Sequence, residues 1–443
     1  MTGWMWRVAS CVLAVAFTTP PAAHAVTPPP IDHSRLPEPA PPAPPTPTVQ
    51  REMCSVPATH DDKPTQLAGI DLPQVWRLSR GSGQRVAVID TGVAPHPRLP
   101  DTVAGGDYVS TGDGTQDCDG HGTAVAGIIA AAPDPEQDGF SGVAPDVTLI
   151  SIRQSSTKFG AIADPSTTGF GDVDTLAKAV RTAADLGASV INISSVACVS
   201  VDTRLDDRAL GAALAYAVDT KNAVVIAAAG NTGGTAQCPA QQPETTWDTA
   251  TVAVSPAWYD DYVLTVGSVN SRGEPSPFTL AGPWVDVAAS GEAVMSLSLT
   301  GDGIVNALGA EPDSELLSGT SYAAPVVSGL AALIRTRFPA LSARQVMQRI
   351  ETTAHHPPGG RDSLVGNGVV DVLAAVSTDA PANPPPRDRP VPVAPPTPVA
   401  APDRSSRNTA FTGAAICLAL LAVTLIAGTV KARLRRTDGV PRD

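Results

Sequence analysis

The chain has 443 residues, including 44 Pro and 38 Gly; 43% of its residues are hydrophobic and its formal net charge is −13. This length is sufficient for one large domain with a substantial core, together with extensions. The negative charge, with no basic stripe in the central region of the sequence, argues against a nucleic-acid partner.

The first 25 residues have the three parts of a secretory signal peptide. Arg7 precedes an apolar stretch at 8–17, and a small-residue run ends at Ala25. We expect cleavage after Ala25. An uncleaved membrane anchor is the alternative, because Trp4 and Trp6 lengthen the apolar part.

Two proline-rich regions flank the middle of the chain. The first is an N-terminal extension at 26–64, with its prolines concentrated at 27–48, and the second is a linker at 379–409. Such segments bury too little apolar surface to fold, and they behave as extended, semi-rigid spacers.

Residues 65–378 form one predicted domain, in which short apolar runs alternate with helical patterns. We expect strands at 85–89, 147–152, 190–193, 223–228 and 262–266, and helices at 121–132, 173–186, 207–218, 324–335 and 343–352. Continuous β-branched strands between helices imply an α/β fold, with a parallel sheet covered on both faces.

A second long apolar segment, at 410–430, carries no charge. A helix of this length spans roughly 30 Å, the thickness of a bilayer core. The tail at 431–443 begins with basic residues, which stay on the cytoplasmic side. The sequence therefore predicts a single-pass protein of the cell membrane, with the large domain extracytoplasmic and the C-terminus cytoplasmic.

The cysteines agree with this location. Two of the six lie in the predicted signal peptide and membrane span, and four lie outside them: Cys54, Cys118, Cys198 and Cys238. An even number in an oxidising compartment predicts two disulfides, for which three pairings are possible. Because there is no CxxC and no paired Cys/His spacing, we expect no zinc; we assign no metal and no cofactor.

Three motifs place an Asp, a His and a Ser in Gly-rich turns beside apolar runs. They are VAVIDTGVAPHP with Asp90, DGHGTAVAGIIAA with His121 and SGTSYAAPVVSGLAALI with Ser321. A serine becomes a good nucleophile when a histidine takes its proton, and the histidine needs a carboxylate to fix its tautomer and stabilise its cation. The three residues together therefore predict nucleophilic acyl transfer.

The positions of these residues fit that chemistry. Asp90 ends a predicted strand, where α/β folds place their sites. Ser321 opens a helix with Pro325 in its first turn, and the helix dipole there favours developing negative charge. Asn231 ends another strand in a Gly-Asn pair and can direct its amide at an oxyanion; such a donor is worth roughly 3 kcal/mol.

The other histidines lack such a frame. The adjacent pair His355-His356 could suggest a metal site, but neighbouring side chains point apart, which favours a solvated loop.

With these positions, the chain resembles the subtilisin-like serine proteases (subtilases) over about residues 65–376. VIDTG at 88–92, HGT at 121–123 and GTS at 319–321 stand as in that family, and Asn231 matches its oxyanion asparagine. The order Asp, His, Ser is also the subtilisin order. The whole plan, from signal peptide to C-terminal span, resembles the mycosins, which are membrane-anchored subtilases of actinobacterial type VII secretion systems.

The resemblance implies a three-layer subtilisin-like fold, a serine endopeptidase that processes secreted protein substrates, and association with the type VII secretion membrane complex. An assembly subunit that has little need for proteolysis is the alternative. Calcium, frequent in subtilases, has no clear acidic loop here and is left unassigned.

Three departures from subtilases carry further predictions. The extension is too proline-rich to be a folded pro-domain, so we expect Cys54 to tie it to the domain, in a hypothesis that pairs Cys54–Cys118 and Cys198–Cys238. Residues Ser194-Ser195-Val196-Ala197 stand where subtilisins tend to have Ser-Leu-Gly-Gly. With Ser194, Ser195 and Val196 as its lining, we expect a narrow first specificity pocket and slow, selective cleavage after small residues. The polar segment at 155–171 is an extra surface loop, either a partner contact or a disordered insert.

Overall fold

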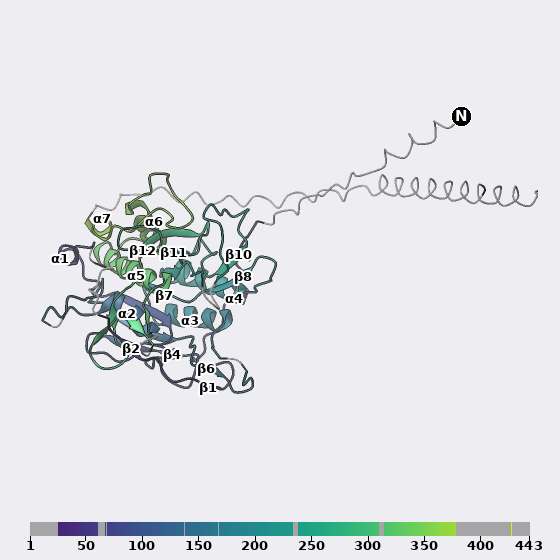
Figure 1. Ribbon diagram of the computed structural model, residues 1–443, viewed down its shortest axis with the longest axis horizontal. Helices are drawn as coiled ribbons and strands as arrows, with labels where there is room; N and C mark the ends of the chain where they lie inside the picture. Colours follow the sequence, from purple (N-terminus) through teal and green to yellow (C-terminus); the bar gives the residue numbers. More distant parts are fainter. Residues whose placement is uncertain are drawn as a thin grey trace, which may run out of the picture. The chain divides into compact units, whose positions relative to one another are not determined.

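Seven parallel strands form the central sheet of the folded unit (Figure 1). Their order across the sheet is β12-β11-β9-β7-β3-β5-β4, so the strand that comes first in the chain lies inside the sheet. Their bounds are β3 (Arg85–Asp90), β4 (Thr102–Asp107), β5 (Thr148–Arg153), β7 (Val190–Ile193), β9 (Val224–Ala228), β11 (Val263–Val269) and β12 (Val285–Ser290). Every adjacent pair runs parallel.

The computed structural model describes residues 25–60, 67, 69–136, 138–166, 168–233, 238–309, 314–377 and 427. The chain divides into two units, Met1–Ala380 and Pro381–Asp443, and nearly all described residues belong to the first. Among the described residues, no helix has both the length and the apolar character that crossing a membrane requires. The predicted signal peptide and membrane span fall outside the described part, apart from Ala25 and Ala427.

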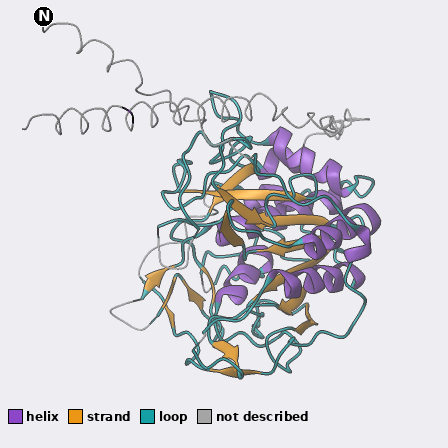
Figure 2. Ribbon diagram, turned by 90° about the vertical axis from the view of Figure 1, so that its right-hand side faces the viewer, coloured by secondary structure: helices purple, strands orange, loops and turns teal. Residues whose placement is uncertain are grey.

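Helices flank the sheet in two groups that pack among themselves. Helices α2 and α5 contact each other, and α5 also lies against β7, β9, β11 and β12; α3 and α4 contact each other, and α3 lies against β3, β5 and β7. Their bounds are α2 (His121–Ala130), α3 (Val173–Asp185), α4 (Arg208–Ala215) and α5 (Thr320–Arg337). Figure 2 shows the helices gathered beside the sheet, away from a region of loops and short strands.

The sequence pattern explains this arrangement. Strands β7, β9 and β11 are buried along their whole length, as expected for a parallel sheet that is covered on both faces. Helix α5 is buried continuously from Thr320 to Ile334, and its apolar residues occur all around the helix rather than on one face. The predicted α/β fold with a mainly parallel, helix-flanked sheet is confirmed.

All ten predicted strands and helices are present; the strand at 190–193 has the predicted bounds, and the other nine have at least one shifted end. Two strands at the sheet edges escaped the sequence pattern, because β4 contains a Gly-Gly pair and β12 contains Asp286. Helix α5 begins four residues before the predicted start at 324. The helix predicted at 207–218 consists of α4 and the π-helical turn η2 (Tyr216–Thr220), which follows it directly. The remaining helices are α1 (Leu72–Trp76), α6 (Ala343–Thr353), α7 (Val372–Ser377) and the 3₁₀ turn η1 (His33–Arg35).

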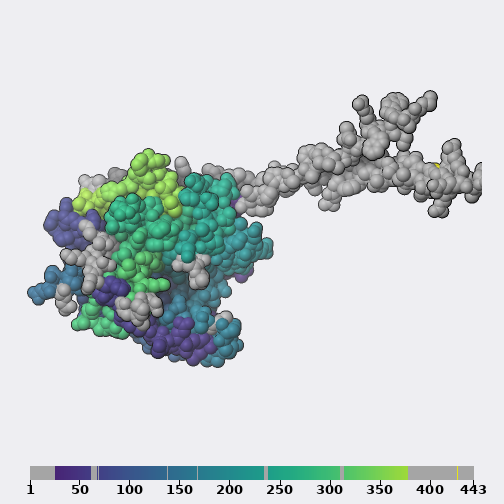
Figure 3. All heavy atoms as spheres, in the orientation of Figure 1, coloured from purple at the N-terminus to yellow at the C-terminus, as the bar shows by residue number. Residues whose placement is uncertain are grey.

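The N-terminal extension does not behave as a free spacer, and that prediction is wrong for the residues at 27–48: Ile31 and Leu36 pack against the core, and the carbonyl of Pro37 accepts from Arg181. Val26 is buried, and its N–H donates to the carbonyl of Trp247. Strand β1 (Thr48–Gln50) pairs antiparallel with β6 (Phe159–Ala161), and β2 (Pro57–Ala58) pairs with β15 (Ala307–Leu308). An extended segment with little core of its own can still be held where a preformed surface satisfies its backbone groups. In Figure 3 purple atoms of this extension lie along the lower surface of the unit.

The polar segment at 155–171 is ordered where the structure describes it, because it contains β6; the disordered alternative is wrong for that part. Four further short strands pair in the loop region: β8 (Ala197–Ser200) with β10 (Val252–Ser255), and β13 (Ser296–Leu297) with β14 (Ile304–Val305). Strand β16 (Glu315–Leu316) pairs with β15.

Candidate active site

The fold brings together the Asp, His and Ser of the three motifs. Asp90 is the last residue of β3, His121 is the first residue of α2, and Ser321 lies in the first turn of α5. His121 Nδ1 lies 2.7 Å from Asp90 Oδ1, and His121 Nε2 lies 2.9 Å from Ser321 Oγ. A carboxylate can only accept, so Nδ1 carries the proton and Nε2 is left to accept from the serine hydroxyl.

The carboxylate of Asp90 is buried and is fixed by the backbone of the next residue. Its side chain is 3% exposed, and Oδ1 also accepts a hydrogen bond of 2.8 Å from the N–H of Thr91. Its other oxygen, Oδ2, is buried and has no hydrogen-bond partner among the described residues. The interaction with His121 is therefore directed through one carboxylate oxygen.

The surroundings of His121 favour its cation. Burial lowers the pKa of His121, but the charge and hydrogen bond of Asp90, with the charges of Asp117 and Asp119, outweigh it and raise the pKa above the ordinary value. The ring of Tyr322 lies 5.0 Å from the imidazole, and burial raises the pKa of this phenol, so it stays neutral. A histidine with this balance is suited to take a proton and to hold it.

Close backbone packing explains the glycine after the histidine. A Cβ atom on Gly122 would lie 2.0 Å from the carbonyl oxygen of Gly92, in the loop that follows Asp90. No side chain fits that gap. The glycine therefore allows the start of α2 to approach the end of β3 closely enough for the Asp90–His121 hydrogen bond.

Asn231 lies close to Ser321, across Gly319. Its Oδ1 accepts hydrogen bonds from the backbone N–H and the hydroxyl of Thr320, at 2.9 and 3.0 Å. This fixes the amide and leaves Nδ2 as the group that faces the site. A Cβ on Gly319 would lie 3.0 Å from Ser321 Oγ and 3.1 Å from Asn231 Nδ2, so the glycine leaves open the space that these two atoms border.

The three residues predicted to line the specificity pocket follow β7. Ser194 is buried; its hydroxyl accepts from Asn192 Nδ2 at 2.8 Å and donates to the carbonyl of Ser321 at 3.2 Å. It therefore supports the backbone of Ser321. Ser195 and Val196 are half-buried, and Val196 Cγ2 lies 3.5 Å from where a Cβ of Gly230 would be.

The structure contains two disulfides, Cys54–Cys118 and Cys198–Cys238, with the pairing of the hypothesis. The first joins the extension to the loop before His121. The second joins β8 to the residues after Asn231.

The adjacent histidines His355 and His356 form their contacts outside the active site. His355 Nε2 contacts Asp371 at 3.3 Å, and His356 Nδ1 bonds the carbonyl of Asn367 at 2.7 Å. Within the described residues, no group of three His, Cys, Asp or Glu side chains could hold a metal ion.

Sequence reasoning missed a set of residues behind the histidine: Thr91, Asp117 and Thr123. All three are buried, and they bond one another. The available signal was an Asp four residues before the motif His, with Thr91 directly after Asp90 and Thr123 two residues after His121.

Comparisons with known proteins agree with this geometry. The Subtilase family profile (Peptidase_S8) matches residues 81–368. Mycosin-4 of Mycobacterium tuberculosis is 68% identical over 440 residues, which cover 97% of this chain and 96% of that protein.

Solved structures agree as well. The MycP3 protease of the type VII (ESX-3) secretion system is 47% identical with a TM-score of 0.74, covering 80% of this chain and all of that one. A chain in the intact ESX-5 inner membrane complex is 41% identical with a TM-score of 0.75, covering 92% of this chain and 100% of that chain. The chain therefore belongs to the mycosins, within the subtilase family of serine proteases.

Proposed function

We propose that this chain is a membrane-anchored serine endopeptidase that processes secreted proteins outside the cytoplasmic membrane, with Asp90, His121 and Ser321 as its catalytic residues. The observation that carries the proposal is the continuous hydrogen-bond chain from Asp90 Oδ1 through the imidazole to Ser321 Oγ. In this arrangement the serine proton has an acceptor, and the acceptor has a fixed tautomer.

The reaction follows from that chain. Ser321 Oγ attacks the carbonyl carbon of the peptide bond, and its proton passes to His121 Nε2, while Asp90 stabilises the imidazolium. The carbonyl oxygen becomes an oxyanion that Asn231 Nδ2 stabilises, together with the backbone N–H groups in the first turn of α5. His121 then protonates the leaving amine, and a water molecule, deprotonated by the same histidine, releases the acyl group from Ser321.

Specificity is proposed to favour small residues before the cleaved bond. The support is the half-buried position of Ser195 and Val196 beside the strand that leads to Asn231. Side chains at these positions leave less room than glycines would.

The proposed domain plan is a signal peptide at 1–25, an extension at 26–64, a peptidase domain at 65–378, a linker at 379–409, a membrane helix at 410–430 and a cytoplasmic tail at 431–443. Burial of Val26, with its backbone nitrogen bonded to Trp247, supports a mature chain that begins after Ala25. The anchor predicts that the full chain sediments with membranes, and that a chain ending at residue 380 does not; equal sedimentation of both would contradict it.

A second function, as an assembly subunit of a type VII secretion membrane complex, is favoured by a different observation. Relatives of this chain stand in structures of the intact ESX-5 inner membrane complex and of its periplasmic assembly, and the latter relative is 44% identical. We propose the same kind of partner for this chain, to be tested by co-purification from detergent.

One experiment separates the two functions. A fluorophosphonate probe is expected to label the full chain and not its Ser321→Ala variant; absence of label on the wild type would overturn the protease proposal. The same variant is then expressed in cells that lack the wild-type gene. Secretion that survives Ser321→Ala while substrate cleavage is lost assigns transport to the folded protein, and lost secretion assigns it to proteolysis.

A further inference from the structure

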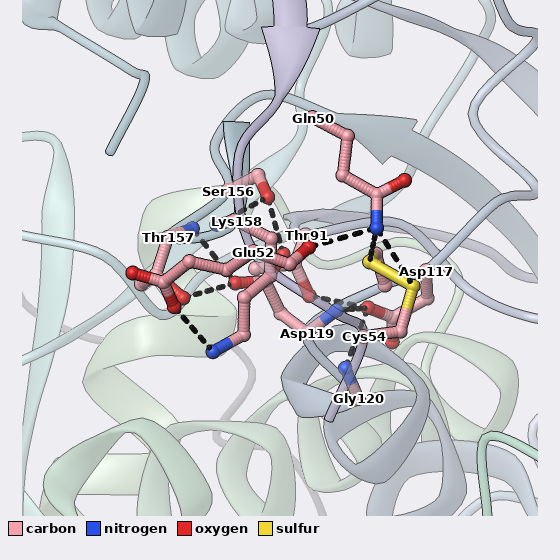
Figure 4. The surroundings of a disulfide bond; sticks show 11 residues. Gln50, Glu52, Cys54, Thr91, Asp117, Asp119, Gly120, Ser156, Thr157 and Lys158 are labelled. Atoms are coloured by element: carbon pink, nitrogen blue, oxygen red, sulfur yellow. Dashed lines mark hydrogen bonds and ion pairs between the residues drawn. A yellow bond between two sulfur atoms is a disulfide. The ribbon is translucent and has the colours of Figure 1, made fainter. Parts of the chain in front are cut away.

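Asp117 is a buried carboxylate behind the catalytic histidine, and it accepts hydrogen bonds from five donors. Oδ1 accepts from the Thr91 hydroxyl at 2.9 Å and from the backbone N–H of Asp119 and Gly120, at 3.1 and 2.8 Å. Oδ2 accepts from the N–H and the hydroxyl of Thr123, at 2.9 and 2.6 Å. Figure 4 shows Asp117 beside the disulfide of Cys54, with Thr91 and Gly120 directed at it.

The two threonines turn this carboxylate into a cross-link between two segments. Thr91 directly follows Asp90, and its oxygen accepts the N–H of Gly122 at 2.9 Å. Thr123 lies two residues after His121, and its oxygen accepts the N–H of Ala94 at 2.9 Å. Each hydroxyl therefore donates to Asp117 and accepts from the opposite segment, which closes the network in both directions.

This network spans the contact between Asp90 and His121 on which the proposed reaction depends. The segment 90–94 carries the carboxylate of the triad, and the segment 120–123 carries its imidazole. Because each threonine hydroxyl has a single proton, only an acceptor at position 117 leaves its lone pairs free for the backbone N–H of the other segment. We propose that Asp117 is a positioning residue for the hydrolysis, which holds Asp90 and His121 in register through Thr91 and Thr123.

The proposal rests on the proposed protease function and adds a residue that touches neither the substrate nor the reacting atoms. The carboxylate of Asp117 also places a negative charge near the imidazole of His121. The charged groups that raise the pKa of His121 are Asp90, Asp117 and Asp119, in that order. Burial raises the pKa of Asp117 itself to about 6, so it is ionised and accepts all five donors at neutral pH.

Asp119 provides a matched comparison, because it is a buried carboxylate two residues away with a different set of partners. It accepts from the Ser156 hydroxyl at 2.5 Å and from the N–H and hydroxyl of Thr157, at 2.7 and 2.5 Å. These bonds fasten the loop to Ser156 and Thr157, just before β6 (Figure 4), and none of them reaches the segment after Asp90.

The test compares Asp117→Asn with Asp119→Asn in the full chain, solubilised in detergent. In Asp117→Asn the amide NH2 group faces N–H and O–H donors that the carboxylate accepted. We therefore expect kcat for a peptide anilide with Ala before the cleaved bond to fall about 10- to 100-fold, with little change in KM. Loss of the charge also moves the acidic limb of the kcat/KM profile to lower pH. Asp119→Asn is expected to keep its kcat and to show a smaller displacement of that limb.

A second pair of variants guards against misfolding. Thr123→Val preserves the shape of a fully buried side chain and removes its hydroxyl, whereas Thr123→Ser restores the hydroxyl. We expect the first to lose activity as Asp117→Asn does and the second to recover it, with the rate of fluorophosphonate labelling following the same order.

The outcomes are distinguishable. An unlabelled wild type overturns the protease function and this inference together. A labelled wild type with an equally active Asp117→Asn, or with Thr123→Ser no better than Thr123→Val, overturns the inference alone.

Discussion

Val196 occupies the point where the chain turns from β7 towards β8, and its side chain approaches Gly230. If it narrows the specificity pocket, Val196→Gly should admit larger side chains. We expect kcat/KM for a peptide with Phe before the cleaved bond to rise about 10-fold or more relative to the Ala peptide. Val201→Gly makes the same change at an exposed residue beyond β8 and is expected to leave the ratio unchanged. A wild type that already turns over the Phe peptide rapidly would show that the pocket is wide.

At the residue scale, the sequence predicted the groups that meet in the site, because each stands in a dense local motif. Asp90, His121 and Ser321 need only their own neighbours to be recognised. Asp117 cannot be recognised from its own neighbours alone, since its role also depends on Thr91, whose hydroxyl meets it only after β3 and α2 have come together.

At the scale of elements, the short strands β1 and β2 attach the extension, and Cys54, which forms the disulfide with Cys118, lies between them in the chain. Two- and three-residue strands are weak alone. The disulfide closes a loop with a sequence separation of 64, which corresponds to about 4 kcal/mol in the chain-entropy account.

Removal of this disulfide should therefore release the extension. In a Ser321→Ala background, the double variant Cys54→Ser/Cys118→Ser is expected to lose about 4 kcal/mol of unfolding free energy and to be trimmed by added trypsin before residue 60. The double variant Cys198→Ser/Cys238→Ser removes a disulfide of similar separation, 40 residues, and should keep its extension intact. An extension that stays intact without the Cys54–Cys118 disulfide would mean that the strands alone hold it.

The elements also mark the limit of sequence reasoning. Buried apolar runs gave the inner strands, but β4 and β12 lie at sheet edges, where Gly and Asp are tolerated. The proline-rich extension predicted a spacer, because composition reports whether a segment can fold alone and not whether a neighbouring surface will hold it.

At the scale of the whole molecule, the formal net charge of −13 coexists with carboxylates inside the fold: Asp117, Asp207 and Asp286. Burial raises the pKa of all three; for Asp286 the charges of Asp260 and Glu351 add to the effect. Hydrogen bonds, in contrast, lower the pKa of exposed carboxylates such as Asp113 and Glu274. The buried and the exposed carboxylates therefore affect the free energy of unfolding in different pH ranges.

These pKa directions predict that the peptidase domain becomes more stable when the pH falls from 8 to 5. A group whose pKa is higher in the folded than in the unfolded state contributes stability that is complete below the unfolded value and is lost as the pH rises through the folded value. For Asp117 that window lies between its ordinary value and about 6, and it corresponds to on the order of 3 kcal/mol. His121, whose pKa is also raised, acts in the same direction at higher pH. The exposed carboxylates oppose this only below about pH 4, where they gain protons.

The melting temperature of Ser321→Ala, measured at steps of half a pH unit, should therefore rise by several degrees towards pH 5, and Asp117→Asn in that background should flatten the rise. A melting temperature that falls steadily from pH 8 to 5 would mean that the buried carboxylates are better solvated than their positions in the fold indicate.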